Sequence, residues 1–361
     1  IEISNLQNQE AFKGYELGLL AKIGIHHKFS TGYIDFKDDR ILKQLKLNII
    51  QLAILIKTLT KFLNKNSVDY YVMFSGGPII YRMAARIFKA HGLNGISHER
   101  GSTTGTYQFF ENENCFSTIN HINNFNLFFK NKRTEISEFK WIIKHLSERK
   151  NGENTNFIKF TDKVNHKYNI KDLLKLDKNR QVISLMLSTD HDTLQGLGER
   201  EHLFTDQIEC IKYMVSIFKS KDAYLIIKPH PAIHIDKRFF TYLANLQLNA
   251  NSNLRIILPR DNISSYKLIQ ISDGILTCGS TVGIESIIYN KPVLSFIKNA
   301  YAMLDCGIKY IEKVEHVSKE VDKLLDRKYI IDINKITIAL KYLLYKFKYC
   351  NFNFKSIKIE N

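Results

Sequence analysis

The sequence has no long hydrophobic run and few prolines, cysteines or acidic residues. Its longest uninterrupted apolar stretches, such as residues 52–56 and 223–227, span five residues, whereas a membrane-spanning helix needs roughly 20. We therefore expect no transmembrane segment. The five cysteines are odd in number and include no CxxC pair, which disfavours a disulfide framework and a zinc site and fits a reducing cytoplasm.

The shortage of acidic residues leaves the chain strongly basic. Its 361 residues include 52 Lys+Arg and 36 Asp+Glu, a formal net charge of +16. Such an excess predicts an anionic partner: nucleic acid, a membrane surface or a phosphorylated substrate. The lysines are dispersed and no nucleic-acid-binding module is recognisable. We therefore expect no nucleic-acid partner, and a non-enzymatic polyanion-binding protein is an alternative.

Each of the five prolines lies in a short loop beside a predicted strand, and the one in the first half is Pro78. The aromatic run 70–74 predicts a strand, 75–78 a loop, 79–91 a helix and 94–97 a second strand. This βαβ unit predicts a parallel sheet. Upstream, the lysine-punctuated segment 41–63 is typical of an amphipathic helix that packs on the protein.

The second half repeats the strand, turn and helix order more regularly. Its predicted strands are residues 182–187, 223–227, 254–258, 274–277 and 293–296, and its predicted helices are residues 205–218, 239–248, 264–272 and 282–289. This order predicts a doubly wound α/β domain, in which ligands bind beyond the carboxyl ends of the strands. The polar loops of this half all follow strands.

A polar stretch rich in asparagine and lysine separates the halves. We predict a first domain over residues 1–150, a linker over 151–180, a second domain over 181–330 and a basic, aromatic C-terminal segment over 331–361. The first residues contain neither an initiator methionine nor a signal-peptide pattern. We therefore expect the natural start of the chain to lie upstream.

A loop of small residues, Gly279-Ser280-Thr281, lies between a predicted strand and the helix that follows it. Small residues at a helix N-terminus offer backbone N–H groups, hydroxyls and the positive end of the helix dipole, which suit a phosphate. Glu285, about one turn later in the helix, could accept hydrogen bonds from the hydroxyls of a ribose. A plain helix N-cap is the competing interpretation.

His230 lies between two prolines, after a strand that ends near Lys228. The prolines stiffen the backbone and hold the imidazole at the sheet edge. The two side chains together suit a diphosphate or a departing nucleotide phosphate. A purely structural histidine is the alternative.

Two further loops carry candidate acid–base groups. The first, Ser188-Thr189-Asp190-His191-Asp192, offers hydroxyls and a pair of carboxylates, but such a loop pair is usually solvated, so we expect no metal site. The second loop is His98-Glu99-Arg100-Gly101. Glu99 could act there as a general base that takes the proton of a sugar hydroxyl, and Arg100 could orient an anionic acceptor. A solvated Glu–Arg pair is the alternative.

The order of these loops resembles the capsule polysaccharide synthesis glycosyltransferases, a group that includes bacterial Kdo transferases. The resemblance rests on KPHP, SSYKLIQISDG, GSTVGIE and NKPVL; it is firm over about residues 180–300 and weaker over 70–110. Sialyl- and polysialyltransferases, poly(glycerol phosphate) polymerases and UDP-GlcNAc 2-epimerases are similar more distantly. The resemblance implies an α/β GT-B fold, in which two Rossmann-like, doubly wound parallel-sheet domains face a cleft.

The resemblance also implies roles for single residues. Glu99 falls where the family has its catalytic base, but the family's acidic motif is present only in part, so Asp190 or Asp192 is an alternative base. His230 joins Glu99 and Asp190 as a catalytic residue. The expected nucleotide-binding residues of the C-terminal domain are Ser188, Thr189, Lys228, His230, Gly279, Ser280, Thr281 and Glu285, and the expected acceptor-binding residues of the N-terminal domain are Gly76, Gly77, Arg100 and Gly101.

These roles predict an inverting glycosyltransferase that needs no cofactor and no divalent metal. It would move a sugar from a nucleotide donor, with CMP-Kdo favoured, to a bacterial capsule or lipopolysaccharide glycan. A CDP-glycerol or CDP-ribitol phosphotransferase is the enzymatic alternative. We expect a cytoplasmic protein.

The C-terminal segment suggests a use for part of the positive charge. Residues 335–358 contain six lysines and no acidic residue, interleaved with tyrosines and phenylalanines. Such a segment suits an anionic membrane surface, which would place the protein peripherally at the inner membrane. A closing helix packed on the domain is the alternative.

Overall fold

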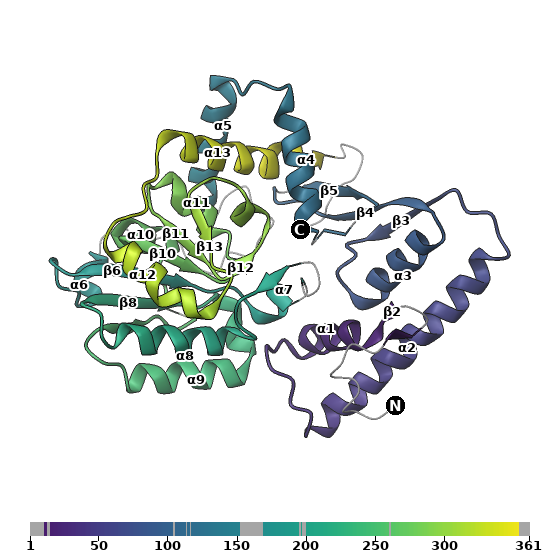
Figure 1. Cartoon of the computed structure of the whole chain (residues 1–361), viewed down its shortest axis with the longest axis horizontal. Helices are drawn as coiled ribbons and strands as arrows, with labels where there is room; N and C mark the ends of the chain where they lie inside the picture. The colour runs from purple at the N-terminus through teal and green to yellow at the C-terminus, as the bar shows by residue number, and fades with distance from the viewer. Residues whose placement is uncertain are drawn as a thin grey trace.

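The chain folds into two α/β parts, each built on its own sheet (Figure 1). The larger sheet belongs to the C-terminal half of the sequence and the smaller one mainly to the N-terminal half. The computed structural model describes residues 11–353 apart from 13–14, 104, 113, 116, 152–168, 195, 197–199 and 260.

The larger sheet has six strands, and all neighbouring strands run parallel. In spatial order they are β13 (Ile308–Tyr310), β11 (Val293–Ser295), β10 (Gly274–Thr277), β6 (Gln181–Met186), β8 (Ala223–Lys228) and β9 (Leu254–Ile256). The predicted doubly wound parallel sheet of the second half is therefore confirmed. The edge strand β13 was not predicted from the sequence.

Helices cover both faces of this sheet, as the buried side chains of β6 show. Ile183 and Leu185 belong to one apolar cluster, whereas Val182 and Met186 belong to a second one. The first cluster includes residues of α8 (Gln207–Phe218), α9 (Lys237–Leu248) and α12 (Val317–Leu325), and the second includes residues of α10 (Ser265–Ile271), α11 (Val282–Ile288) and α13 (Ile333–Leu344). A strand buried on both faces explains why the sequence here is almost continuously apolar.

The smaller sheet departs from the prediction because it is mixed. Its spatial order is β14 (Phe352–Asn353), β5 (Thr106–Glu111), β4 (Asn94–Arg100) and β3 (Tyr70–Phe74). Only β3 and β4 pair in parallel; β4 pairs with β5, and β5 with β14, in antiparallel fashion. The connection between β4 and β5 is too short for a parallel crossover, which needs about a dozen residues. A doubly wound parallel sheet was therefore wrong for this half.

The N-terminal helices form a layer beside the smaller sheet. α1 (Leu17–Phe29), α2 (Asp39–Leu63) and α3 (Ile79–Ala90) pack around one apolar cluster. The Asp38 carboxylate accepts the backbone N–H of Arg40 at 2.9 Å and caps α2. The amphipathic packing helix predicted over 41–63 is confirmed. Neither α2 nor any other helix in the described ranges is long and apolar enough to cross a membrane.

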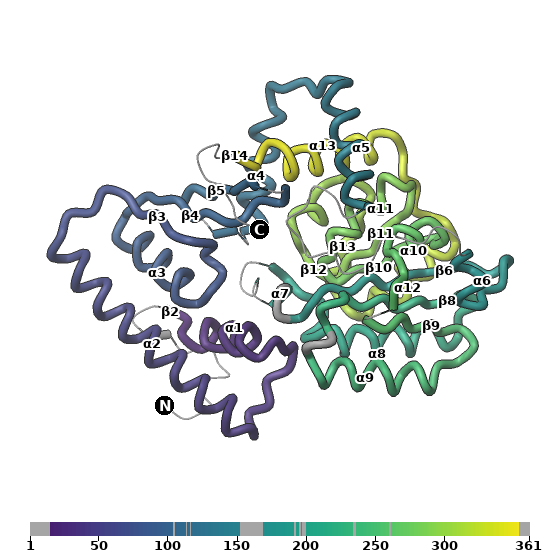
Figure 2. The backbone as a smooth tube through the Cα atoms, turned by 180° about the vertical axis from the view of Figure 1, so that it is seen from behind, coloured from purple at the N-terminus to yellow at the C-terminus, as the bar shows by residue number. Residues whose placement is uncertain are grey.

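Three helices and the chain end connect the two parts. α4 (Thr118–Lys130) and α5 (Ile136–Lys150) contribute to the same apolar cluster as α13. α13 leads to β14, which pairs with β5 of the smaller sheet (Figure 2). The predicted linker, 151–180, lies mostly outside the described residues, and the predicted domain bounds stay a prediction.

The basic, aromatic C-terminal segment packs on the protein instead of forming a free surface. Tyr342 and Phe347 are buried in the apolar cluster of α13. The amide oxygen of Asn351 accepts the backbone N–H of Ser102 at 2.9 Å and ties the segment to the smaller sheet. The structure therefore favours the closing-helix interpretation for the described part of this segment; residues 354–361 lie outside it.

The remaining elements are short. They are the strands β1 (Ala11–Phe12), β2 (Tyr15–Glu16), β7 (Glu201–His202) and β12 (Ile297–Lys298), the helices α6 (Ile170–Leu173) and α7 (Asp190–Leu194), the 3₁₀ segments η2 (Pro231–Ile235), η3 (Ala300–Met303) and η4 (Val314–His316), and the π-helical turn η5 (Tyr345–Tyr349).

Candidate active site

The carboxyl ends of three adjacent strands meet at one edge of the larger sheet. β6 lies between β10 and β8, and Met186 pairs with both Thr277 and Lys228. The loops that follow these strands therefore begin at the same level. The fold thus brings together three of the predicted loops, which lie far apart in the sequence: 188–190, 229–231 and 278–281.

Lys228 is the last residue of β8, and its side chain is buried. Burial lowers the pKa of its ammonium group to about 8, and the negative charge of Asp261 opposes this shift only in part. A phosphate placed beside Lys228 would favour the charged lysine and raise the pKa again. The position therefore suits the anionic ligand that the sequence predicts.

His230 begins the 3₁₀ segment η2, and its ring is oriented by the backbone. Its Nδ1 accepts the backbone N–H of Ala232 at 3.2 Å. A neutral imidazole that accepts at Nδ1 carries its proton at Nε2. His230 can therefore act as a hydrogen-bond donor through Nε2, as a phosphate ligand requires.

The Gly279-Ser280-Thr281 loop is shaped by a left-handed glycine and a tyrosine. Gly279 has a φ of +82°, a conformation that glycine adopts without strain. The hydroxyl of Tyr301 donates to the carbonyl oxygen of Ser280 at 2.6 Å. The hydroxyl of Thr281 makes no capping hydrogen bond to α11. The backbone N–H of Ser280 donates to Oγ1 of Thr277 at 3.0 Å, and that of Val282 donates to Oγ of Ser280 at 3.4 Å. Ser280 thus helps to cap α11, and phosphate binding by this loop stays a prediction.

Glu285 has protein partners in α5 and α10. Its carboxylate is buried, lies 3.5 Å from Nη2 of Arg149 and accepts the hydroxyl of Tyr266 at 2.5 Å. The Arg149 pair joins α5 to α11. A ribose contact by Glu285 stays a prediction, and it requires the nucleotide to share or replace one of these partners.

Asp190 is held in place at the contact between the two parts of the protein. Its Oδ1 accepts the backbone N–H and the side-chain amide of Gln207 at 3.1 and 3.0 Å. A Cβ added to Gly32, in the loop after α1, would lie only 2.3 Å from its Oδ2. Gln207 also binds the backbone N–H of Ser188 at 2.9 Å, and Thr189 is buried. These contacts give the 188–190 loop a structural role beside its predicted one.

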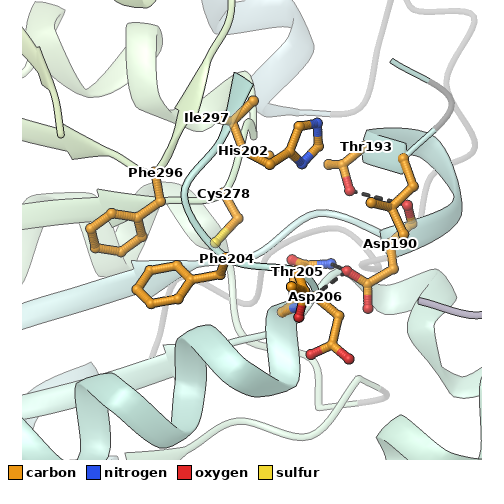
Figure 3. Close-up of a pocket in the computed structure, with 11 residues that line it drawn as sticks. Asp190, Thr193, His202, Phe204, Thr205, Asp206, Cys278, Phe296 and Ile297 are labelled. Atoms are coloured by element: carbon orange, nitrogen blue, oxygen red, sulfur yellow. Dashed lines mark hydrogen bonds between the residues drawn. The ribbon is translucent and has the colours of Figure 1, made fainter. Parts of the chain in front are cut away.

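The cavity beside Asp190 is small. Figure 3 shows Asp190 and Thr193 on one side and Phe296 and Cys278 on the other. The cavity measures about 10 Å³, which is room for about one water molecule. No substrate fits there, so a role of Asp190 as the base would need the loop to open. The side chain of Asp192 lies outside the described residues.

Burial also perturbs the carboxyl group of Asp190. Burial raises its pKa from 3.8 to about 7, and the charges of Asp206 and Asp236 act in the same direction. Because the folded state binds the proton more tightly than the unfolded state, this group makes the free energy of unfolding fall as the pH rises from about 4 to 7.

Asp190→Asn should remove this pH-dependent loss of stability. At about pH 8 the variant is expected to exceed the wild type in free energy of unfolding by up to about 4 kcal/mol, and the two should converge near pH 4. Urea unfolding of both proteins across this range measures the difference. A difference that does not change with pH would contradict the assignment.

At the smaller sheet, Glu99 lies near the Gly76–Gly77 turn. The backbone N–H of Ser75 donates to the carbonyl oxygen of His98 at 2.6 Å, so the residue before Glu99 lies beside the turn. Burial raises the pKa of the Cys115 thiol to about 11, and the negative charge of Glu99 adds to the shift. The thiol lies 3.6 Å from the hydroxyl of Ser75, the residue before the turn. Glu99 Oε1 also accepts the backbone N–H of Arg100 at 2.8 Å. The fold therefore brings the predicted base to the predicted acceptor loop.

Arg100 and Gly101 are placed differently from Glu99. Both Glu99 and Arg100 belong to β4, so their side chains point to opposite faces of the sheet, and Arg100 is exposed. Gly101 allows close packing, because a Cβ there would lie 2.1 Å from Oγ1 of Thr106 and 2.5 Å from Oδ1 of Asn351. Acceptor binding by these two residues stays a prediction.

Three cations that the sequence did not single out gather near these groups. Burial lowers the pKa of Lys346 to about 8, and the positive charges of Arg149 and Arg200 lower it further, while Glu285 opposes them. Arg200 also acts on Cys115 of the first part and on Tyr301 of the second. Positive charges from both parts of the sequence therefore act on Lys346, and the carboxylate of Glu285, which pairs with Arg149, offsets them in part. No periodicity or motif marks these residues, which lie far apart in the sequence.

No three histidine, cysteine, aspartate or glutamate side chains within the described ranges are grouped as a metal site requires. That the reaction needs neither a metal nor a cofactor stays a prediction.

A family model described as capsule polysaccharide biosynthesis protein matches residues 106–341. A comparison with curated proteins gives no match. Among solved structures, the fold is similar to Thermosulfurimonas dismutans KpsC, beta Kdo 2,4 transferase (12% identity, 74% of this chain and 76% of that chain, TM-score 0.45). It is also similar to the KpsC beta Kdo 2,7 transferase of the same organism (11% identity, 79% of this chain and 79% of that chain, TM-score 0.44). A third similar structure is the Methanocaldococcus jannaschii UDP-GlcNAc 2-epimerase in complex with UDP-GlcNAc and UDP (13% identity, 90% of this chain and 94% of that chain, TM-score 0.41).

Proposed function

The chain belongs to the capsule polysaccharide biosynthesis protein family, and from this premise we propose that it is an inverting GT-B glycosyltransferase. It transfers a sugar from a CMP-linked donor, with CMP-Kdo favoured, to a capsule or lipopolysaccharide glycan. The observation that supports this proposal is that the carboxyl ends of β6, β8 and β10 meet at one sheet edge, and Lys228, His230 and Ser280 lie at the end of β8 or in the loops that follow β8 and β10.

In the proposed reaction, Glu99 accepts the proton of the acceptor hydroxyl while the hydroxyl oxygen attacks the anomeric carbon. The bond between that carbon and the phosphate oxygen breaks, and its electron pair stays on the CMP that leaves. His230 donates a hydrogen bond to this phosphate through Nε2, and Lys228 stabilises its charge. A single displacement inverts the configuration at the anomeric carbon.

The cations between the two parts favour an anionic donor. The positive charges of Arg149 and Arg200 both act on Lys346 there. A CMP-linked acidic sugar brings a phosphate and a carboxylate, both of which such cations attract. Because a nucleotide sugar and a glycolipid acceptor meet at the inner face of the inner membrane, we propose that the protein works there.

Thermal shifts with CMP, CDP, UDP and GDP test the nucleotide. A ligand at about 100 times its Kd stabilises the folded state by about 2.7 kcal/mol and so raises the melting temperature. We expect CMP to give the largest shift, because it is the nucleotide of the proposed donor. A shift with UDP alone would contradict a CMP-linked donor. With the matching donor and acceptor, CMP release with a phosphate-free product supports sugar transfer, whereas phosphate in the product indicates a phosphotransferase.

A further inference from the structure

We propose that the outer face of α2 docks the protein onto an anionic membrane surface. This inference rests on the membrane location in the proposed function and names the surface responsible. It also assigns a role to positive charges that the candidate active site does not use.

The outer face of α2 combines exposed aliphatic side chains with lysines. Leu47, Ile50 and Ile54 are 42%, 53% and 57% exposed, and their spacing places them on one side of the helix. Exposed lysines lie before and after them, at Lys43, Lys46, Lys57 and Lys61. At 100° per residue these seven side chains fall within an arc of about 100°, and Lys43 and Lys61 are roughly 27 Å apart along the axis.

The rest of the protein holds this face outward. The opposite side of α2 is buried through Leu45, Leu52 and Ile56, which pack with α1 and α3. Figures 1 and 2 show α2 along the outer rim of the N-terminal part, away from the larger sheet. Docking by this face therefore leaves the strand ends of the candidate active site uncovered.

The charge of this segment favours a lipid surface over other partners. Residues 40–68 contain no aspartate or glutamate. A symmetric contact with a second copy would bring lysines against lysines, which is unfavourable. Nucleic acid would neutralise the lysines but would leave Ile50 and Ile54 without an apolar environment. An anionic bilayer provides a partner for the lysines and for the isoleucines, because its headgroups attract lysines while aliphatic side chains enter the interface.

Co-sedimentation of the full chain with vesicles tests the proposal. We expect binding to phosphatidylcholine vesicles that contain about one third phosphatidylglycerol, and little binding to phosphatidylcholine alone. Lys57→Gln with Lys61→Gln should lower the partition coefficient roughly 30-fold. Ile50→Ser with Ile54→Ser should lower it at least tenfold, since the apolar contact is lost. Circular dichroism checks that these variants fold.

A matched control uses exposed lysines of the C-terminal part. Lys219→Gln with Lys319→Gln removes the same charge from the residue after α8 and from α12, which both belong to the part built on the larger sheet, and should change the partition coefficient less than threefold. No binding by the wild type, an equal loss in the control, or unchanged binding after the isoleucine substitutions would each overturn the proposal. Nucleotide thermal shifts do not depend on this face, so failure of docking and failure of the proposed function are distinguishable.

Discussion

His230→Ala is expected to lower kcat for sugar transfer by about 10² to 10³. The reason is that negative charge gathers on the phosphate of the leaving CMP, and we propose that the Nε2 proton of His230, whose Nδ1 accepts the backbone N–H of Ala232, is donated to it in a hydrogen bond. Initial rates of CMP release with saturating donor and acceptor measure the effect.

His230→Asn is the matched variant. The imidazole Nδ1 also accepts the backbone N–H of Ala232 at the start of η2, so alanine removes a cap worth about 1 kcal/mol of stability. Asparagine restores an acceptor for this N–H but does not place a donor where Nε2 lies. We expect wild-type stability and an alanine-like rate. Transfer at the wild-type rate by either variant would refute a role in catalysis.

Glu99→Gln is expected to lower the transfer rate by about 10² to 10⁴, because glutamine cannot accept the proton of the acceptor hydroxyl. The substitution is otherwise mild, since the glutamine carbonyl can still accept the backbone N–H of Arg100. The donor should still bind, so CMP should stabilise this variant as much as the wild type. The rate should also lose the rise with pH that reports ionisation of the base.

Asp190→Asn separates the two candidate bases. Asp190 is enclosed by Gln207 and by the loop that contains Gly32, so we expect its substitution to alter stability with pH and to change transfer less than tenfold. If Asp190→Asn abolished transfer while Glu99→Gln left it intact, the base would be Asp190.

The pattern of the sequence predicted the larger sheet well. Strands expected at 182–187, 223–227 and 274–277 match β6, β8 and β10 closely. These strands are buried on both faces, so their apolar runs are unbroken, and each is bounded by a turn or a proline. The loops that follow them could therefore be located, and their meeting followed from the parallel arrangement.

The same reasoning failed for the smaller sheet. The strand expected at 94–97 extends to Arg100, and β5, which pairs antiparallel with β4, was not expected. The polar residues at the end of β4 hide its continuation, because its hydrogen bonds to β5 come from the backbone and leave no mark in the side-chain pattern. Glu99 and Arg100, which the sequence presents as neighbours in a loop, therefore lie on opposite faces of a strand.

The sequence by itself determined the strong positive charge, the parallel sheet of the second half and the residue types that suit a nucleotide phosphate, because periodicity, turn residues and composition are local properties. Only the tertiary structure decided that the charges of Arg149 and Arg200 act on Lys346 and that Asp190 is enclosed. It also decided that Tyr342 and Phe347 of the C-terminal segment are buried while α2 presents lysines and isoleucines to solvent. Burial and the approach of distant charges depend on which segments pack together, and a single sequence does not specify that packing locally. The +16 charge therefore divides between a proposed donor site and a proposed membrane face.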